Sequence, residues 1–195
     1  MADKKVRSST LVGVGRKELY KIFADKGFTK GCEVGVRHGT NALVMLETIP
    51  NLELILVDPY IKYEYRNFKR RNKWKWHQDT MDKVRANGLR FMSDKNVRWL
   101  MTTSELAAPC VPDESLDFVY IDGNHAYEFV AQDIILWGRK VRPGGIISGH
   151  DYGIRWVRRA VDCYAKSLGY SVKVTDRSME KRKSRTIVSW MMEKP

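Results

Sequence analysis

The stretch Leu116–Tyr152, LDFVYIDGNHAYEFVAQDIILWGRKVRPGGIISGHDY, decides the fold of this chain. It opens with a short apolar run that ends at Asp122, and it closes with a second apolar run, residues 145–149, followed by His150 and Asp151. Between the two runs, apolar residues recur every three or four positions, as on one face of a helix. These residues are Tyr127, Val130, Ile134 and Trp137. The pattern predicts a strand, a helix and a second strand, with a turn at Pro143-Gly144-Gly145 between the helix and the second strand.

The two strands of such a unit are parallel and, as a rule, adjacent. Adjacent strands lie about 5 Å apart, so Asp122 and the pair His150-Asp151 should leave the sheet side by side at its carboxyl edge. Ligands of open parallel sheets bind at that edge. Together with His125, these residues predict a functional site. The alternative is an ordinary turn at Asp122 and a helix cap at Asp151, but capping explains only one of the two acids.

Length and composition indicate one soluble α/β domain. The chain has 195 residues, of which 43% are hydrophobic, and it shows no internal repeat. No apolar run approaches the roughly 20 residues that span a bilayer, and the first residues lack the apolar core of a signal peptide. Three widely spaced cysteines predict a reducing compartment, hence a cytoplasmic protein. We expect a flexible arm over residues 1–10 and a single domain over 11–195.

The charge of the chain favours acidic partners. Its formal net charge is +12 and its pI is about 9.7, as for proteins that bind nucleic acid, anionic glycans or an anionic cosubstrate, although charge also serves solubility. Residues 61–77, IKYEYRNFKRRNKWKWH, carry seven basic residues and one acid among five aromatic ones. This block follows a predicted strand and should overhang the same crevice. It could be a lid, a clamp for an acidic acceptor or a surface that stacks single-stranded bases, or its tryptophans could simply pack under a helix.

The remaining pattern alternates strands and helices. Further strands are expected at residues 30–36, 52–57, 97–101, 170–175 and 186–192. Further helices are expected at residues 16–26, 40–48, 78–86 and 156–168, with Gly169 ending the last. Ser104 could cap a short helix, Cys32 is expected in the core, and the last two strands are expected to pair as an antiparallel hairpin at one edge.

The first predicted strand runs into a loop with glycines at positions 31, 35 and 39. This spacing differs from the GxGxxG of pyrophosphate binders and suits a ligand without phosphates. Asp58 ends the second strand, where an acid commonly accepts hydrogen bonds from ribose hydroxyls. Glu33 could hold an ammonium group or orient the loop. Together these residues suggest a nucleoside ligand such as S-adenosylmethionine, against the alternatives of a salt bridge at Glu33 and a plain turn at Asp58.

Six segments carry a family resemblance: EVGVRHGT (33–40), VDPY (57–60), TTSE (102–105), LDFVYIDGNHAYE (116–128), VRPGGII (141–147) and GHDY (149–152). They resemble class I S-adenosylmethionine-dependent methyltransferases. More narrowly, they resemble the macrocin O-methyltransferase-like and cephalosporin-hydroxylase-like branch, cousins of catechol O-methyltransferase, over about residues 28–192. The resemblance implies a single Rossmann-like domain with a seven-stranded, mostly parallel sheet of order 3-2-1-4-5-7-6, in which strand 7 is antiparallel.

The resemblance also implies where the cosubstrate binds. Glu33, Gly35 and Gly39 would form the cosubstrate loop, and Asp58 would bind the ribose. Ser104 and Glu105 would flank the adenine.

For the catalytic end, the resemblance implies that Asp122 and Asp151 hold a divalent metal, magnesium or manganese, and that His125 acts as the general base. His150, a candidate third ligand, stands where related enzymes have a carboxylate or an amide. Magnesium prefers oxygen ligands, so a histidine there favours manganese or iron, or no metal.

The function expected from these residues is O-methylation of a small molecule or saccharide, with S-adenosylmethionine as donor and divalent-metal assistance. One alternative is a nucleic-acid methyltransferase that uses residues 61–77. The absence of an Asn-Pro-Pro-aromatic motif disfavours the commonest base N-methylation. Another alternative is a catalytically silent module that binds cosubstrate or nucleic acid. We expect no membrane partner, and the sequence leaves the acceptor, the metal and the oligomeric state open.

Overall fold

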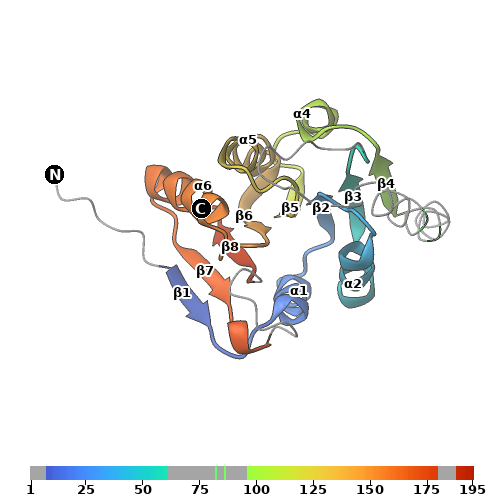
Figure 1. The fold of residues 1–195 in the computed structure, drawn as a ribbon. Helices are drawn as coiled ribbons and strands as arrows, with labels where there is room; N and C mark the ends of the chain where they lie inside the picture. Colours follow the sequence, from blue (N-terminus) through green and yellow to red (C-terminus); the bar gives the residue numbers. More distant parts are fainter. Residues whose placement is uncertain (1–7, 61–81, 83–85, 87–95, 180–187) are drawn as a thin grey trace.

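A computed structural model describes residues 8–60, 82, 86, 96–179 and 188–195 of the chain, which form a sheet with helices on both faces (Figure 1). The strands are β1 (Ser8–Leu11), β2 (Lys30–Val34), β3 (Glu53–Val57), β4 (Val97–Leu100), β5 (Leu116–Ile121), β6 (Val141–Gly149), β7 (Val172–Thr175) and β8 (Trp190–Glu193). The helices are α1 (Arg16–Asp25), α2 (Thr40–Thr48), α4 (Ser104–Ala107), α5 (Tyr127–Gly138) and α6 (Arg155–Leu168), with short 3₁₀ turns at Ala108–Cys110 and Arg177–Met179.

The strand order is β1-β7-β8-β6-β5-β2-β3-β4. Without β1, and read from the other end, the order is β4-β3-β2-β5-β6-β8-β7. If β2 is counted as strand 1, this is 3-2-1-4-5-7-6. The predicted order is therefore confirmed. The predicted antiparallel strand is also confirmed, because β8 runs antiparallel to both β6 and β7.

An eighth strand, β1, was missed. It pairs in parallel with β7 at the edge of the sheet, so the flexible arm predicted over residues 1–10 was wrong for Ser8–Thr10, while residues 1–7 lie outside the described residues. The side chains of β1 are mostly exposed, so the strand carries no apolar alternation. Backbone pairing to the free edge of β7 forms it, which composition does not reveal.

The central strands β5 and β6 are parallel neighbours, as predicted, with Ile121 opposite Gly149. The turn predicted at Pro143-Gly144-Gly145 was wrong. Helix α5 already ends at Gly138, and β6 begins at Val141, so this tripeptide lies inside the strand at an irregularity in its register with β5. Proline has no N–H for the ladder and glycine accepts bulge geometry, so the tripeptide makes a bulge here.

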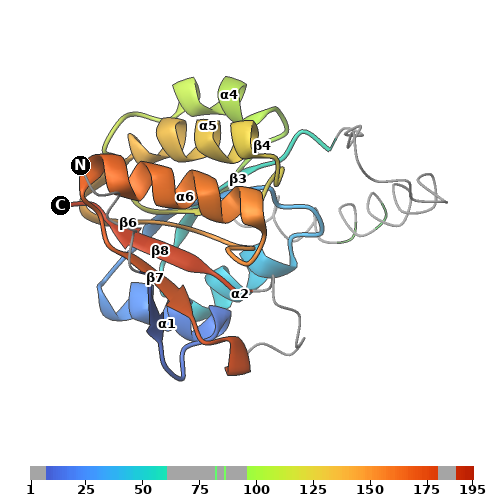
Figure 2. The same ribbon diagram turned by 60° about the vertical axis from the view of Figure 1, so that its left-hand side comes forward.

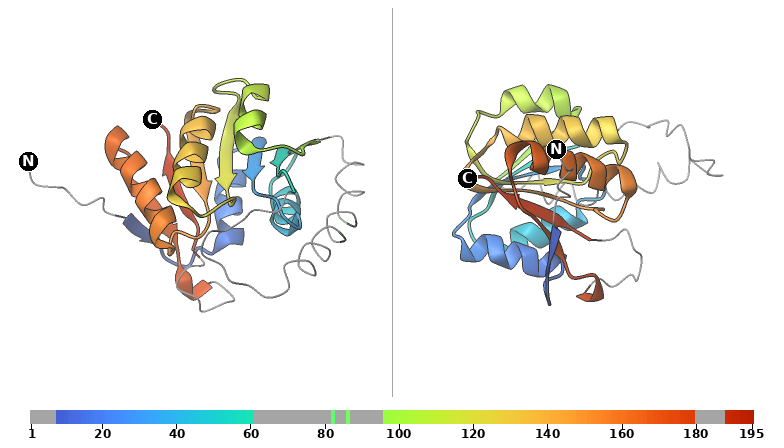
Figure 3. Two further views of the ribbon diagram at one scale, coloured as in Figure 1. Left: turned by 45° about the horizontal axis from the view of Figure 1, so that its top comes forward. Right: turned by 90° about the vertical axis from the view of Figure 1, so that its left-hand side faces the viewer.

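Two apolar layers cover the sheet. Helices α4, α5 and α6 pack on one face, and α1 and α2 pack on the other (Figures 2 and 3). The strands between them contribute to both layers, and Cys32 is fully buried, as predicted. Helix α6 ends at Gly169, which has φ +72, so that predicted stop is confirmed. Asp82 and Ala86 are helical, and the rest of the helix predicted over 78–86 lies outside the described residues. None of the described helices is long and apolar enough to cross a membrane.

Candidate active site

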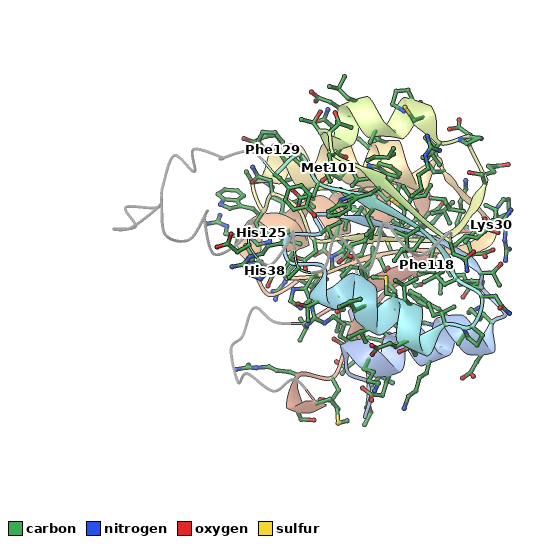
Figure 4. The ribbon with its side chains drawn as sticks, turned by 90° about the vertical axis from the view of Figure 1, so that its right-hand side faces the viewer. Lys30, His38, Met101, Phe118, His125 and Phe129 are labelled. Carbon is green, nitrogen blue, oxygen red and sulfur yellow. The ribbon has the colours of Figure 1, made fainter. Side chains whose placement is uncertain are left out.

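The parallel strands bring several loops together at one edge of the sheet. Three backbone hydrogen bonds join their ends: Gly35 N to Val57 O (2.8 Å), Asp122 N to Val34 O (2.7 Å) and His150 N to Ile121 O (3.0 Å). Figure 4 shows His38, after β2, and His125, after β5, at this carboxyl edge, whereas Lys30 at the start of β2 lies at the opposite edge. The loops that carry the predicted site residues therefore start side by side.

Asp122, His125, His150 and Asp151 lie together at this edge, and we call them the Asp–His cluster. His125 Nε2 lies 3.1 Å from Asp151 Oδ2 and 3.9 Å from Asp122 Oδ1. His150 Nδ1 lies 3.4 Å from the same Asp151 oxygen and 3.8 Å from the same Asp122 oxygen. Each histidine thus faces both carboxylates, and the structure brings together all four residues that the sequence placed at neighbouring strand ends.

The capping alternative for Asp151 was wrong. The N-cap position of α6 is Ile154, and no side chain caps that helix; the Asp151 carboxylate faces the histidines instead. Asp151 has φ +56, a left-handed conformation that costs energy for a residue with a side chain. Asparagine and aspartate tolerate it better than most residues. The fold therefore maintains an uncommon backbone geometry that directs this carboxylate into the Asp–His cluster.

The charges of the Asp–His cluster reinforce one another. The carboxylates of Asp122 and Asp151 raise the pKa of His125 to about 9, against the opposing effect of partial burial. Burial alone would raise the pKa of Asp151, but hydrogen bonding to His125 and His150 and their charge bring it below its usual range. At neutral pH the cluster thus holds a proton on His125, next to ionised Asp151.

The cluster also has a donor set suited to a divalent cation. One ligand atom each from Asp122, His125 and Asp151 lie within 4.8 Å of one another. Ligands around a divalent ion at bond lengths of about 2.0–2.2 Å are spaced within that limit. The geometry thus makes His125 the candidate third metal ligand beside the two acids, whereas the sequence had suggested His150 for that position. The Nε2 atom of His150 is buried and has no hydrogen-bond partner among the described residues.

The loop after β2 packs directly against the turn after β5. Gly35 has φ +91, and a Cβ atom there would lie 2.3 Å from the carbonyl oxygen of Asp122, so only glycine fits. Gly39, with φ +73, occupies the N-cap position of α2. Gly35 therefore lets the loop after β2 approach the Asp–His cluster, and Gly39 starts helix α2 behind that loop.

Asp58 organises the loops after β2 and β3. Its Oδ2 accepts a hydrogen bond from the backbone N–H of Arg37 (2.8 Å), and its Oδ1 accepts one from the backbone N–H of Tyr60 (2.8 Å). Both donors have left-handed backbones, with φ +51 at Arg37 and φ +49 at Tyr60. A carboxylate has about four lone-pair sites, so Asp58 keeps acceptor capacity for a ligand hydroxyl.

Glu33 is a buried acid with an unsatisfied oxygen. Its side chain is 1% exposed, its Oε1 accepts a hydrogen bond from Asn41 Nδ2 (2.9 Å), and its Oε2 is buried without a partner among the described residues. Asn41 Oδ1 in turn accepts a hydrogen bond from the Tyr20 hydroxyl (2.6 Å). Burial raises the pKa of Glu33 to about 8, although the bond from Asn41 opposes the rise. Asn41 and Tyr20 were missed because they meet Glu33 only through tertiary packing.

The side chains of Ser104 and Glu105 point to α5. Ser104 Oγ donates to Asp133 Oδ1 (2.5 Å) and accepts from Trp137 Nε1 (2.7 Å). Glu105 Oε2 accepts from Gln132 Nε2 (3.0 Å). The predicted cap at Ser104 was wrong, because Thr103 occupies the N-cap position and its side chain makes no capping bond. That Ser104 and Glu105 contact adenine remains a prediction. In this structure their side chains form hydrogen bonds between α4 and α5.

Exposed apolar residues near this edge were not anticipated. Met101, after β4, is 61% exposed, and Phe129, in the first turn of α5, is 43% exposed. Figure 4 shows both on the side of the molecule that carries His125. The basic-aromatic block 61–77 lies outside the described residues.

Comparisons with known proteins agree with this arrangement. The sequence model of a family described as "Methyltransferase domain" matches residues 32–152. No curated protein matches the chain. Among solved structures, the O-methyltransferase NovP superposes with a TM-score of 0.66 at 17% identity, covering 96% of this chain and 83% of that one. A putative caffeoyl-CoA O-methyltransferase from Staphylococcus aureus gives 0.61 at 10% identity, covering 91% and 82%. TomG from Streptomyces achromogenes, an O-methyltransferase solved with S-adenosylmethionine, gives 0.60 at 10% identity, covering 92% and 79%. At these identities the likeness concerns the fold.

Proposed function

The chain belongs to the methyltransferase-domain family and is an S-adenosylmethionine-dependent methyltransferase; from this premise we propose that it methylates a hydroxyl oxygen of a small molecule or saccharide. The donor occupies the loops after β2 and β3, and the acceptor hydroxyl faces the Asp–His cluster.

The unsatisfied Oε2 of buried Glu33 is the observation that carries the donor site. A buried polar atom without a partner costs free energy unless a ligand or water satisfies it. The ammonium group of S-adenosylmethionine is a suitable partner, because it donates hydrogen bonds and favours the ionised carboxylate. Asp58 accepts from the ribose with its remaining lone pairs. The exposed side chains of Met101 and Phe129 offer apolar surface for the adenine.

Methyl transfer needs an acceptor oxygen that gives up its proton. The oxygen forms a bond to the methyl carbon as the bond from that carbon to sulfur breaks, and the products are a methyl ether and S-adenosylhomocysteine. The donor is already activated, so positioning and proton removal are the main tasks of the protein. His125 Nε2 takes the acceptor proton, and Asp122 and Asp151 stabilise the resulting imidazolium. Since the pKa of His125 is about 9 next to these acids, turnover rises with pH through the neutral range.

A divalent cation suits the same residues, and Asp122 and Asp151 would hold it, with a histidine nitrogen as third ligand. Such an ion would act as a Lewis acid that lowers the pKa of the acceptor hydroxyl. If His125 Nε2 is that ligand, it cannot also take the proton, so the two roles exclude each other. Calorimetric titration of Mn²⁺ into wild type and Asp151→Asn measures binding without an acceptor. Equal heats from both proteins, or activity that survives exhaustive chelation, would contradict the metal site.

The donor site is tested by titration calorimetry with S-adenosylmethionine and S-adenosylhomocysteine. We expect binding by wild type and at least about tenfold weaker binding by Asp58→Ala, the effect of losing a charge-assisted hydrogen bond. Asp113→Ala is a matched control, since it removes an exposed acid that precedes β5 at the opposite edge of the sheet. Its affinity should stay within about twofold of wild type. Absence of binding by wild type would refute the proposed donor, and unchanged affinity in Asp58→Ala would remove Asp58 from the site.

A further inference from the structure

Three arginines stand on the first two turns of α6: Arg155, Arg158 and Arg159. We call them the arginine cluster. Their spacing of three and four residues puts them on one side of the helix, and all three are exposed. Within the described parts of the chain, none of them forms an ion pair with a carboxylate. Helix α6 therefore presents three positive charges that no carboxylate of the described residues pairs with directly.

Each guanidinium rests on an aromatic ring. Arg155 lies over Trp156 (5.1 Å to the ring centroid), Arg158 over Tyr152 (5.2 Å) and Arg159 over Tyr127 (5.6 Å). Arg158 Nε also donates a hydrogen bond to the backbone carbonyl oxygen of Tyr152 (3.3 Å). A guanidinium that lies over a ring can still offer its remaining N–H groups to a ligand. The rings thus hold the arginines in place before any ligand arrives, which reduces the entropy lost on binding.

The stacking rings locate the arginine cluster beside the Asp–His cluster. Tyr152 directly follows Asp151 in the chain, and Tyr127 comes two residues after His125. Helices α5 and α6 run side by side over one face of the sheet, as Figure 2 shows, and both begin at its carboxyl edge. Arg158 and Arg159 therefore lie over the residue that follows Asp151 and over the residue that begins α5 shortly after His125.

A hollow of about 390 Å³ opens at the arginine cluster. Its lining comprises the three arginines, Gly153, Asp162 and Cys163. Ligand sites commonly have volumes of about 300–1,000 Å³, so the hollow can admit a small anionic group with part of its carrier. The one acid of the lining, Asp162, accepts a hydrogen bond from the Tyr152 hydroxyl (2.7 Å), and three positive charges outweigh its single negative charge.

We propose that the arginine cluster binds an oxyanion, a phosphate or a carboxylate, on the methyl acceptor, so that the acceptor is a small hydroxylated molecule with an anionic group. This inference rests on the proposed function for the identity of the acceptor. Guanidinium groups bind such oxyanions through paired, charge-assisted hydrogen bonds. An open hollow lined only by residues within 153–163 favours a small molecule over a nucleic acid, which would need a track of phosphate contacts along its backbone.

The test uses phenyl phosphate, benzoate and phenol as probes for wild-type protein, titrated with and without S-adenosylhomocysteine. We expect phenyl phosphate or benzoate to bind at least about tenfold more tightly than phenol, and the stronger of the two identifies the oxyanion. Arg158→Gln and Arg159→Gln should each weaken that probe by about tenfold or more. Arg158→Lys keeps the positive charge but lacks the planar guanidinium. Its affinity for the probe should lie between those of Arg158→Gln and wild type.

Arg139→Gln is the matched control, because Arg139 is an exposed arginine at the other end of α5. It should leave probe affinity within about twofold of wild type. Equal affinity in wild type and in both cluster variants would overturn the proposal, as would equal losses in Arg139→Gln. A single-stranded oligonucleotide that binds more tightly than either oxyanion, and loses affinity in the same variants, would also overturn it. Titrations without S-adenosylhomocysteine report on the arginines even if the donor assignment fails, so the two failures can be distinguished.

Discussion

Glu33 and Asp151 are two carboxyl groups at the same edge of the sheet with opposite electrostatic environments. Glu33 lies in β2, is fully enclosed and receives one hydrogen bond from the neutral amide of Asn41, and its pKa rises to about 8. Asp151 follows β6 and lies within 3.4 Å of nitrogen atoms of His125 and His150, and its pKa falls below the usual range. Burial acts to raise both pKa values. The charge of Arg16 opposes this effect only in part at Glu33, whereas the two histidines reverse it at Asp151.

The comparison shows that partners, more than depth, set the charge of an acid in this protein. At neutral pH Asp151 is a fixed negative charge, able to hold a proton on His125 or to bind a cation. Glu33 is largely protonated until a cationic ligand group arrives. The two acids are therefore suited to different tasks, Asp151 to proton transfer and Glu33 to ligand binding.

The largest effect should come from removing the proton acceptor of the Asp–His cluster. His125→Ala is expected to lower turnover by about a hundredfold to ten-thousandfold, the usual contribution of a general base. Affinity for S-adenosylmethionine should barely change, because the donor site proposed above uses Glu33 and Asp58 and does not include His125. Once an acceptor is identified, steady-state kinetics and calorimetry of the two proteins measure both quantities.

The pH–rate profile separates catalysis from mere loop support at His125. A base with a pKa raised by two acids gives an ascending limb that the alanine variant lacks. If His125→Ala keeps the ascending limb of the wild type, His125 is not the base. Weaker acceptor binding with an intact profile would then assign it a role in shaping the loop.

Neutralising Glu33 should have a smaller effect, and it should be a gain in the stability of the fold where His125→Ala causes a loss of turnover. A folded-state pKa of about 8, above 4.5 in the unfolded chain, means that folding takes up a proton between these values. The stability linked to Glu33 is thus fully present below about pH 4.5 and is lost as pH rises through about 8. The Glu33→Gln variant does not titrate, so it should match wild type near pH 4.5 and exceed it at pH 9 by roughly 3–5 kcal/mol.

Urea unfolding of both proteins at the two pH values measures this difference. Glu18→Gln serves as a matched control at a partly exposed acid in the first turn of α1, and it should show no comparable gain at pH 9. A Glu33→Gln protein that is less stable than wild type at pH 9 would mean that the carboxylate has a cationic partner in the free protein.

The family resemblance implied the strand order. The residues themselves predicted that Asp122, His125, His150 and Asp151 meet, because neighbouring parallel strands end at one edge of the sheet. The sequence did not predict β1, whose side chains carry no apolar pattern, or the bulge at Pro143-Gly144-Gly145, because the same residues also form turns. The engagement of Ser104 by Asp133 and Trp137 depends on how α4 docks on α5. The three arginines of α6 have a sequence signal, because they stand at helical spacing after GHDY. Their aromatic partners are Trp156 in α6, Tyr152 before it and Tyr127 at the start of α5, and the last of these pairings depends on tertiary packing.

The smallest effect concerns the proton on His125. Asp151→Asn removes the carboxylate whose oxygen lies 3.1 Å from His125 Nε2, so the pKa of His125 should fall from about 9 toward its ordinary value. Asp122→Asn should lower it as well, because hydrogen bonding to Asp122 is the largest cause of the raised pKa of His125, although that oxygen lies 3.9 Å away. NMR titration of the imidazole in metal-free protein, with His125→Ala to assign the resonance, measures both shifts.

Because the pKa of His125 is raised in the folded state, the stability linked to its proton is present below about pH 6.5 and disappears as pH rises through about 9. Both variants should therefore lose stability at pH 6 and little at pH 10. If the His125 pKa is the same in wild type and Asp151→Asn, Asp151 does not hold this proton, and the contrast with Glu33 loses its electrostatic basis.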